Sequence, residues 1–223
     1  MKINPRLKVR REAFTLIELI TVVSVIVILF ALVVGGFTYA DRSSKRSRTD
    51  VVIRATRSAL ESYKEKFGSY PKVANPDSSI TVADKSYVVG GGACLYQAMS
   101  GDGYDYIDIG GANLQSSPTS DGNVDEIEAK NVTLNDMPRE MWTKTDNVYY
   151  MVDGFGHPIR YIKAAPTTAA IPGQAAPDPI TINRGSYDIW SYGEDADNIL
   201  SSSLDAANGG GASRIDVKWI KNW

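Results

Sequence analysis

Residues 10–40 read RREAFTLIELITVVSVIVILFALVVGGFTYA, and this stretch decides how the chain is organised. Its uncharged part runs for 22 residues, from Leu19 to Ala40, and consists mainly of Val, Ile and Leu. A helix of about 20 apolar residues spans the hydrocarbon core of a bilayer. We therefore expect one transmembrane helix near the start of the chain.

The charges on the two sides of this segment predict its orientation. Residues 1–13 carry a net charge of +4. Because the whole chain has a formal net charge of −2, the remaining 210 residues together carry −6. Basic residues favour the cytoplasmic side of a span, which places the N-terminus in the cytoplasm and the bulk of the chain beyond the membrane. A secretory signal peptide is the competing interpretation. However, the apolar run is longer than such a signal, and DRSSKR follows it at 41–46 in place of a small-residue cleavage site.

Glu18 is a carboxylate at the start of the apolar run, where it is either a headgroup-level acid or a functional group that needs a partner. The surrounding residues 10–20 resemble the class III signal of type IV pilins and type II secretion pseudopilins. The resemblance implies a basic leader at 1–13, cleavage by a prepilin peptidase between Ala13 and Phe14, and methylation of the new N-terminus. Glu18 is then the fifth residue of the mature chain. Ala13 departs from the family, which has Gly before the cut.

The same resemblance implies a partner for Glu18. In a packed filament the Glu18 carboxylate of one subunit neutralises the Phe14 ammonium of its neighbour. Because either charge is costly when it is left alone in low-dielectric surroundings, the pair sets the registry between subunits. The helix that spans the membrane is in this interpretation also the assembly interface, over residues 14–40.

An amphipathic stem is expected at 41–70, continuous with the apolar helix. Four large apolar or aromatic residues and one threonine lie at spacings of 3 and 4, which is one face of a helix: Ile53, Thr56, Leu60, Tyr63 and Phe67. Gly68 predicts the end of the helix. The whole helix, Phe14 to Phe67, is about 80 Å long if continuous. Basic residues dominate 41–57, and we expect them to contact lipid headgroups or acidic patches of neighbouring subunits, and not nucleic acid.

The rest of the chain divides into two parts. Residues 71–146 form a variable, loop-rich segment with turns at glycine clusters, Gly90–Gly92 among them, and a short helix near 93–100. Residues 147–223 hold strand patterns at 147–152, 158–164, 187–192 and 215–220. The expected fold is therefore α+β and pilin-like: a long N-terminal helix packed on a small antiparallel sheet of three or four strands.

Two C-terminal segments, DGFGHPIRY at 153–161 and YDIWSYGED at 187–195, resemble the major pseudopilin of type II secretion systems, as does the Asn-Trp end of the chain. That resemblance implies a calcium site in the acidic loop after 190. Oxygen ligands of the kind calcium prefers are available there. The residues assigned to the site are Tyr192, Asp195, Asp197, Asp205 and Asp216, with Asn198 as a further donor. The competing interpretation is a solvated acidic loop.

Composition leaves few resources for catalysis. Cys94 is the one cysteine, so an intrachain disulfide is excluded, and His157 is the one histidine, in a Gly-His-Pro turn that indicates a structural role. We therefore expect no enzyme and no small-molecule substrate. The expected function is a pseudopilus subunit of the inner membrane that helps drive protein export, with a homopolymer, other pseudopilins, the prepilin peptidase and the inner-membrane assembly platform as partners. A minor pseudopilin, a type IV pilin and, remotely, a membrane-anchored periplasmic enzyme are the alternatives.

Overall fold

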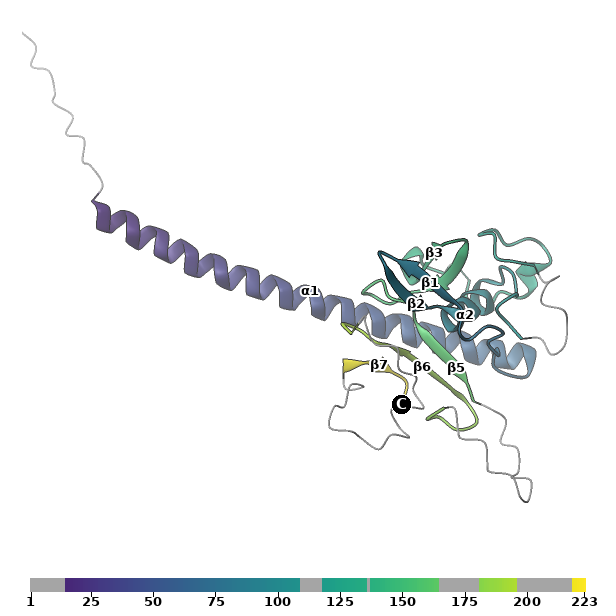
Figure 1. Cartoon of the computed structure of the whole chain (residues 1–223). Coiled ribbons are helices and arrows are strands. Elements are labelled where there is room, and N and C mark those ends of the chain that lie inside the picture. Colours follow the sequence, from purple (N-terminus) through teal and green to yellow (C-terminus); the bar gives the residue numbers. More distant parts are fainter. Residues whose placement is uncertain (1–14, 109–117, 136, 165–180, 196–217) are drawn as a thin grey trace, which may run out of the picture. The chain divides into compact units, whose positions relative to one another are not determined.

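A computed structural model describes residues 15–108, 118–135, 137–164, 181–195 and 218–223 (Figure 1). The chain divides into two compact units, Met1–Ser43 and Ser44–Trp223. A single helix, α1, runs from Leu16 to Phe67 and contributes residues to both units. The helix therefore starts two residues after the expected Phe14 and ends at the expected residue, where Gly68 adopts a left-handed φ of +79°.

The C-terminal part of α1 supplies one wall of the core of the Ser44–Trp223 unit. Its buried residues lie at spacings of 3 and 4 on one face: Thr49, Val52, Ile53, Thr56, Ala59 and Leu60. The hydroxyls of Thr49 and Thr56 donate to the carbonyls four residues earlier, at 2.9 and 2.8 Å, so that burying them leaves no polar group unpaired. The predicted stripe is confirmed as far as Tyr63, whereas Phe67 is exposed at the helix end.

A second helix, α2 at Gly90–Ser100, is buried along nearly its whole length and packs against β4 and β5. Its first turn contains Gly90–Gly92, so the prediction of a turn there is wrong, and the short helix expected at 93–100 begins three residues earlier. Glycine is required because a Cβ on Gly91 would lie 2.6 Å from the carbonyl oxygen of Tyr161. The cluster serves close helix–strand packing, which a sequence alone does not distinguish from a turn.

Seven short strands form three antiparallel sheets within the described residues. One hairpin consists of β1 (Ser79–Val82) and β2 (Lys85–Val88), and another of β3 (Trp142–Thr145) and β4 (Val148–Met151). The third sheet has the order β5-β6-β7, with bounds Arg160–Lys163, Tyr187–Ser191 and Ile220–Lys221. Two short 3-10 turns, η2 at Glu128–Lys130 and η3 at Arg139–Met141, lie in the connections.

The predicted α+β class is confirmed, and the arrangement is consistent with a pilin-like fold. The expected segments at 158–164, 187–192 and 215–220 contribute to one three-stranded antiparallel sheet, β5-β6-β7, whereas the expected strand at 147–152 corresponds to β4, which pairs with β3 in a separate hairpin. Strands β1, β2 and β3 were not expected, since their turns are Ala83–Asp84 and Asp146–Asn147 and lack the glycine that usually marks a hairpin; all four residues adopt positive φ. Of the strand expected at 215–220, residues 215–217 lie outside the described residues, and β7 includes Ile220.

We expect Leu60→Ala to lower the free energy of unfolding by about 2–5 kcal/mol, because Leu60 is fully buried where α1 meets the core. The matched control is Val51→Ala on the same helix, which changes a side chain that is 63% exposed and shifts stability by less than about 0.5 kcal/mol. Urea unfolding of the full chain in detergent, followed by tryptophan fluorescence, measures both. Equal effects of the two substitutions would contradict the assigned core face.

Candidate functional site

A capping box forms the N-terminal end of α1. The Glu18 carboxylate accepts hydrogen bonds from the backbone N–H of Thr15 at 2.9 Å and from its hydroxyl at 2.7 Å. In return the Glu18 N–H donates to the Thr15 hydroxyl at 3.3 Å. This reciprocal pairing satisfies donors that every helix start leaves unpaired, and it places the carboxylate at the positive end of the helix dipole.

Sequence reasoning missed this local role of Glu18, although the Thr-x-x-Glu signature was visible at 15–18. Ala13 and Phe14 lie outside the described residues, so the predicted cleavage point is a sequence inference only. Glu18 itself is exposed. A carboxylate that is held by its own helix on one side and exposed on the other remains available to a second group.

The helix surface that follows Glu18 is apolar on all sides. Large apolar side chains between Leu16 and Tyr39 are each about half exposed or more, and the described residues of the Met1–Ser43 unit include no buried one. A helix that is apolar all round belongs in a membrane or in the middle of a protein assembly. By length and composition α1 is able to cross a membrane, in keeping with the predicted transmembrane helix.

The turn at Asp153–His157, which carries part of the resemblance, is organised by one buried carboxylate. Asp153 Oδ1 accepts from the N–H groups of Phe155 and His157, both at 2.8 Å, and Oδ2 accepts from the Ser191 hydroxyl of β6 at 2.5 Å. Burial raises the pKa of Asp153, and these hydrogen bonds lower it by less. The carboxylate therefore connects the turn to the third sheet.

The same turn lies directly on α1. The Gly154 N–H donates to the Thr49 hydroxyl at 3.0 Å, and a Cβ on Gly154 would lie 2.3 Å from the Lys45 carbonyl oxygen. His157 Nδ1 lies 3.1 Å from the Gly193 carbonyl oxygen. These contacts are architectural, and they give His157 the structural role that its Gly-His-Pro context indicates.

The C-terminal loop predicted to bind calcium is described only at its two ends. Tyr192 and Asp195 lie just after β6, where the Asp195 N–H donates to the Tyr192 carbonyl at 3.1 Å. The other predicted ligands, Asp197, Asp205 and Asp216, and Asn198 lie outside the described residues. Within the described ranges no three Asp, Glu, His or Cys side chains come together to hold a metal. This end of the loop thus offers two carboxylates, Glu194 and Asp195, and one turn of backbone.

An aromatic cluster joins the two ends of this loop, which sequence reasoning also missed. The Tyr192 ring before it packs edge-on against the Trp219 ring after it, with centroids 4.9 Å apart, and Trp219 stacks on Trp190 at 6.1 Å. Arg46 of α1 adds a hydrogen bond to the Lys218 carbonyl at 3.1 Å. The ends of the loop are therefore held together by aromatic packing, in a chain with no second cysteine.

The thiol of Cys94, the one cysteine of the chain, is inaccessible. Cys94 is fully buried in α2, and burial raises the pKa of its thiol above the ordinary value. It packs in the main core cluster with Leu60 and Tyr161. The thiol thus acts as a small apolar group.

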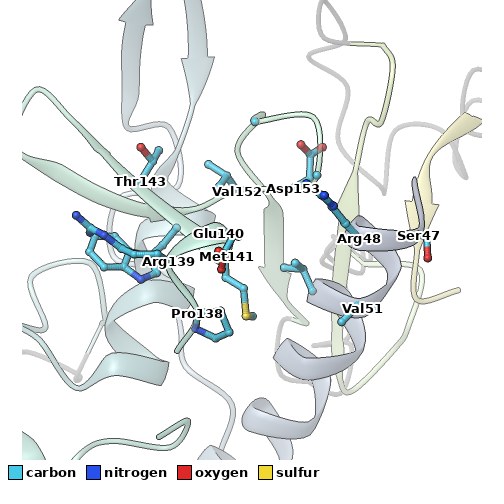
Figure 2. Close-up of a pocket in the computed structure, with 14 residues that line it drawn as sticks. Ser47, Arg48, Val51, Pro138, Arg139, Glu140, Met141, Thr143, Val152 and Asp153 are labelled. Carbon is cyan, nitrogen blue, oxygen red and sulfur yellow. The ribbon is translucent and has the colours of Figure 1, made fainter. Parts of the chain in front are cut away.

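A groove of about 830 Å³ lies on the Ser44–Trp223 unit between α1 and the η3–β3 segment. Figure 2 shows Arg48 and Val51 of α1 on one side and Pro138, Arg139 and Met141 on the other. The Arg139 guanidinium lies over the Trp142 ring, 4.0 Å from its centroid. The groove has an apolar floor between two arginines, a combination not expected from the sequence because its walls are some 90 residues apart in the chain.

No protein-family model, curated protein or solved structure matches this chain.

We expect Asp153→Ala to destabilise the fold by about 3 kcal/mol, because it leaves two backbone N–H groups and one hydroxyl without their acceptor. Asp153→Asn keeps an acceptor and should cost less. Since burial raises the pKa of Asp153, its contribution to stability is greatest below the unfolded pKa and declines as pH rises through the folded value.

The difference in unfolding free energy between the wild type and Asp153→Asn should therefore shrink from pH 3 to pH 7. Urea titrations of both proteins across this range measure it. A difference that grows with pH would mean that the folded protein prefers the ionised carboxylate.

Proposed function

We propose that this chain is a structural subunit of a type II secretion pseudopilus, cleaved before Phe14 and polymerised through its N-terminal helix to help drive protein export. The observation that carries the proposal is the character of α1. It starts with the Thr15–Glu18 capping box, has an exposed apolar surface as far as Tyr39, and packs into a folded core from Thr49 onward. Such a helix suits a protein that is held first in a membrane and then in a filament.

The mechanism follows from the chemistry of that helix. In the inner membrane, with the N-terminus cytoplasmic and the Ser44–Trp223 unit periplasmic, the apolar residues contact lipid. Leaving lipid exposes about 20 apolar residues, and packing them against other copies replaces the lost contacts. The Phe14 ammonium of a neighbour then compensates the Glu18 carboxylate, which the capping box keeps at the helix start. The prepilin peptidase and the assembly platform are the partners this process requires.

The two related alternatives, a minor pseudopilin and a type IV pilin, would rely on the same N-terminal helix. A minor pseudopilin would use the same helix at the tip of the filament. A type IV pilin would also share it, but pilins of that kind usually hold their C-terminal loop with a disulfide. Here Trp190, Tyr192 and Trp219 hold the ends of the loop, and Cys94 is buried elsewhere, which favours the pseudopilin assignment.

Glu18→Ala and Glu18→Gln separate the two roles of this residue. Glutamine still accepts the Thr15 hydrogen bond but carries no charge, whereas alanine removes the cap as well. We expect both variants to insert and to lose residues 1–13 when co-expressed with a prepilin peptidase, as judged by mass spectrometry. Neither should assemble, because both lack the charge that pairs with the neighbouring ammonium.

Sedimentation of sheared cell-surface or membrane assemblies measures the result, with Thr15→Ala as the control that weakens the cap and keeps the charge. If Glu18→Gln assembled as well as the wild type while Glu18→Ala did not, the cap would be the essential feature. That result would contradict the proposed ion pair between Glu18 and the Phe14 ammonium of a neighbouring subunit.

Calcium binding in the C-terminal loop is part of this proposal. Bound calcium would supply a charged centre for oxygen ligands, and Asp195 is the assigned carboxylate ligand that lies within the described residues. One site held at 100 times its dissociation constant adds about 2.7 kcal/mol to stability. We expect a calcium-dependent rise in the melting temperature of the full chain, reversed by chelator and absent in Asp195→Ala.

The matched control is Asp77→Ala, which removes an exposed acid before β1 and should leave the calcium response intact. An unchanged melting temperature on adding calcium to the wild type would support the solvated-loop interpretation. It would also shift the assignment toward a minor pseudopilin or a type IV pilin.

A further inference from the structure

Two exposed apolar side chains of the Ser44–Trp223 unit lie in surroundings of opposite charge. Among its described residues, Ile127 at 74% and Val51 at 63% are the most exposed large hydrophobic side chains. Single exposed apolar residues are ordinary on a protein surface. These two differ because one projects from an acidic segment and the other lies in a groove with arginines on both sides.

The acidic segment comprises residues 121–128, DGNVDEIE, with four acids and no basic residue. Its own hydrogen bonds hold its shape. Asp125 Oδ1 accepts from the Ile127 N–H at 2.7 Å and from the Glu128 N–H at 2.8 Å, and the Glu128 carboxylate accepts from the Gly103 N–H at 3.0 Å. The exposed Val124 and Ile127, with Glu126 beside them, are therefore presented on an ordered piece of backbone.

The groove has the complementary character. Val51 and the buried Met141 give it an apolar floor, and Arg48 and Arg139 lie on opposite walls (Figure 2). Two acids also line it. Glu140 is exposed, whereas the carboxylate of Asp153 is occupied by the amides of its own turn and by Ser191. The α1 stretch 42–57, which contributes one wall, has six basic residues against one acid.

The two surfaces lie at different heights along α1. The acidic segment is followed by residues 129–132, and there the Val132 carbonyl accepts a hydrogen bond from the Lys66 ammonium, near the end of α1, at 3.2 Å. From Val51 to Lys66 is 15 residues, or about 22 Å of helix. A copy displaced along the helix direction by roughly this distance brings its acidic segment level with the groove of another.

We propose that the acidic segment 121–128 of one copy docks in the Val51–Arg139 groove of a second copy of this chain, with Ile127 on the apolar floor and the Glu126 carboxylate toward Arg48 and Arg139. The contact is heterologous, so each copy offers both surfaces, and repeating it along a common axis builds an open array. Charge complementarity selects the register and orientation of such a contact. The inference rests on the proposed filament function and names an interface outside the apolar helix.

Cysteine crosslinking in the full chain tests it. A double variant, Val51→Cys with Ile127→Cys, is expressed in membranes with a prepilin peptidase and treated with a short thiol crosslinker. The buried Cys94 is the background, measured in the unsubstituted chain. The matched control pairs Val51→Cys with Val82→Cys, because Val82 of β1 is also an exposed valine, outside the acidic segment. We expect a ladder of covalent oligomers severalfold stronger for the 51–127 pair than for the 51–82 pair.

Assembly is measured in parallel by sedimentation of the uncrosslinked chain, which separates the two proposals. Assemblies that form without a 51–127 ladder above control would overturn the docking inference and leave the filament function standing. A chain that never assembles would overturn both. A charge exchange tests whether Arg48 and Glu126 face each other across the contact. Arg48→Glu should weaken the ladder of crosslinked oligomers, and adding Glu126→Arg to the same chain should restore it. Failure to restore it, with reduced membrane association instead, would assign Arg48 to lipid headgroups and contradict the docking contact.

Discussion

The packing of α1 against α2 and the strands is the constraint on which the rest of the Ser44–Trp223 unit depends. Half of the residues from Thr49 to Leu60 are buried there, and the hydroxyls of the two threonines among them are satisfied within the helix itself. Burial of this face offsets the entropic cost of ordering many short strands, few of which would be stable alone. Glycines stand where backbone meets backbone: Gly154 lies against the Lys45 carbonyl of α1, and Gly91 of α2 lies against Tyr161 of β5.

A second set of contacts connects this core to the C-terminal segment. Asp153 joins its own turn to β6 through Ser191, His157 reaches Gly193, and Arg46 reaches Lys218. All three contacts converge on the region where the acidic loop begins and ends. Together with the Tyr192–Trp219 packing they hold the base of that loop close to α1. Any ligand bound in the loop would therefore act on a base already anchored to the helix.

The functional proposal combines two kinds of surface with different chemistry. The apolar helix surface from Leu16 to Tyr39 offers strong but weakly directional association, since hydrophobic contacts have little angular preference. Charged groups supply direction: Glu18 at the helix start, and the acidic segment and arginine groove on the folded unit. A subunit that is extracted from a membrane and added to a filament in one register requires both kinds of surface.

The sequence by itself determined the long helix, its apolar and amphipathic halves, its end at Gly68 and the α+β class, because these depend on local periodicity, charge and helix-stop signals. It also contained the Thr15–Glu18 cap, which is local. Tertiary structure alone decided that Gly90–Gly92 begin a buried helix, that the strands form three sheets, and that the Val51 groove exists. Each of these arises from residues far apart in the chain that the fold brings together, such as Gly91 against Tyr161, or Arg48 and Arg139 on opposite walls of one groove, and such pairs leave no periodic signal.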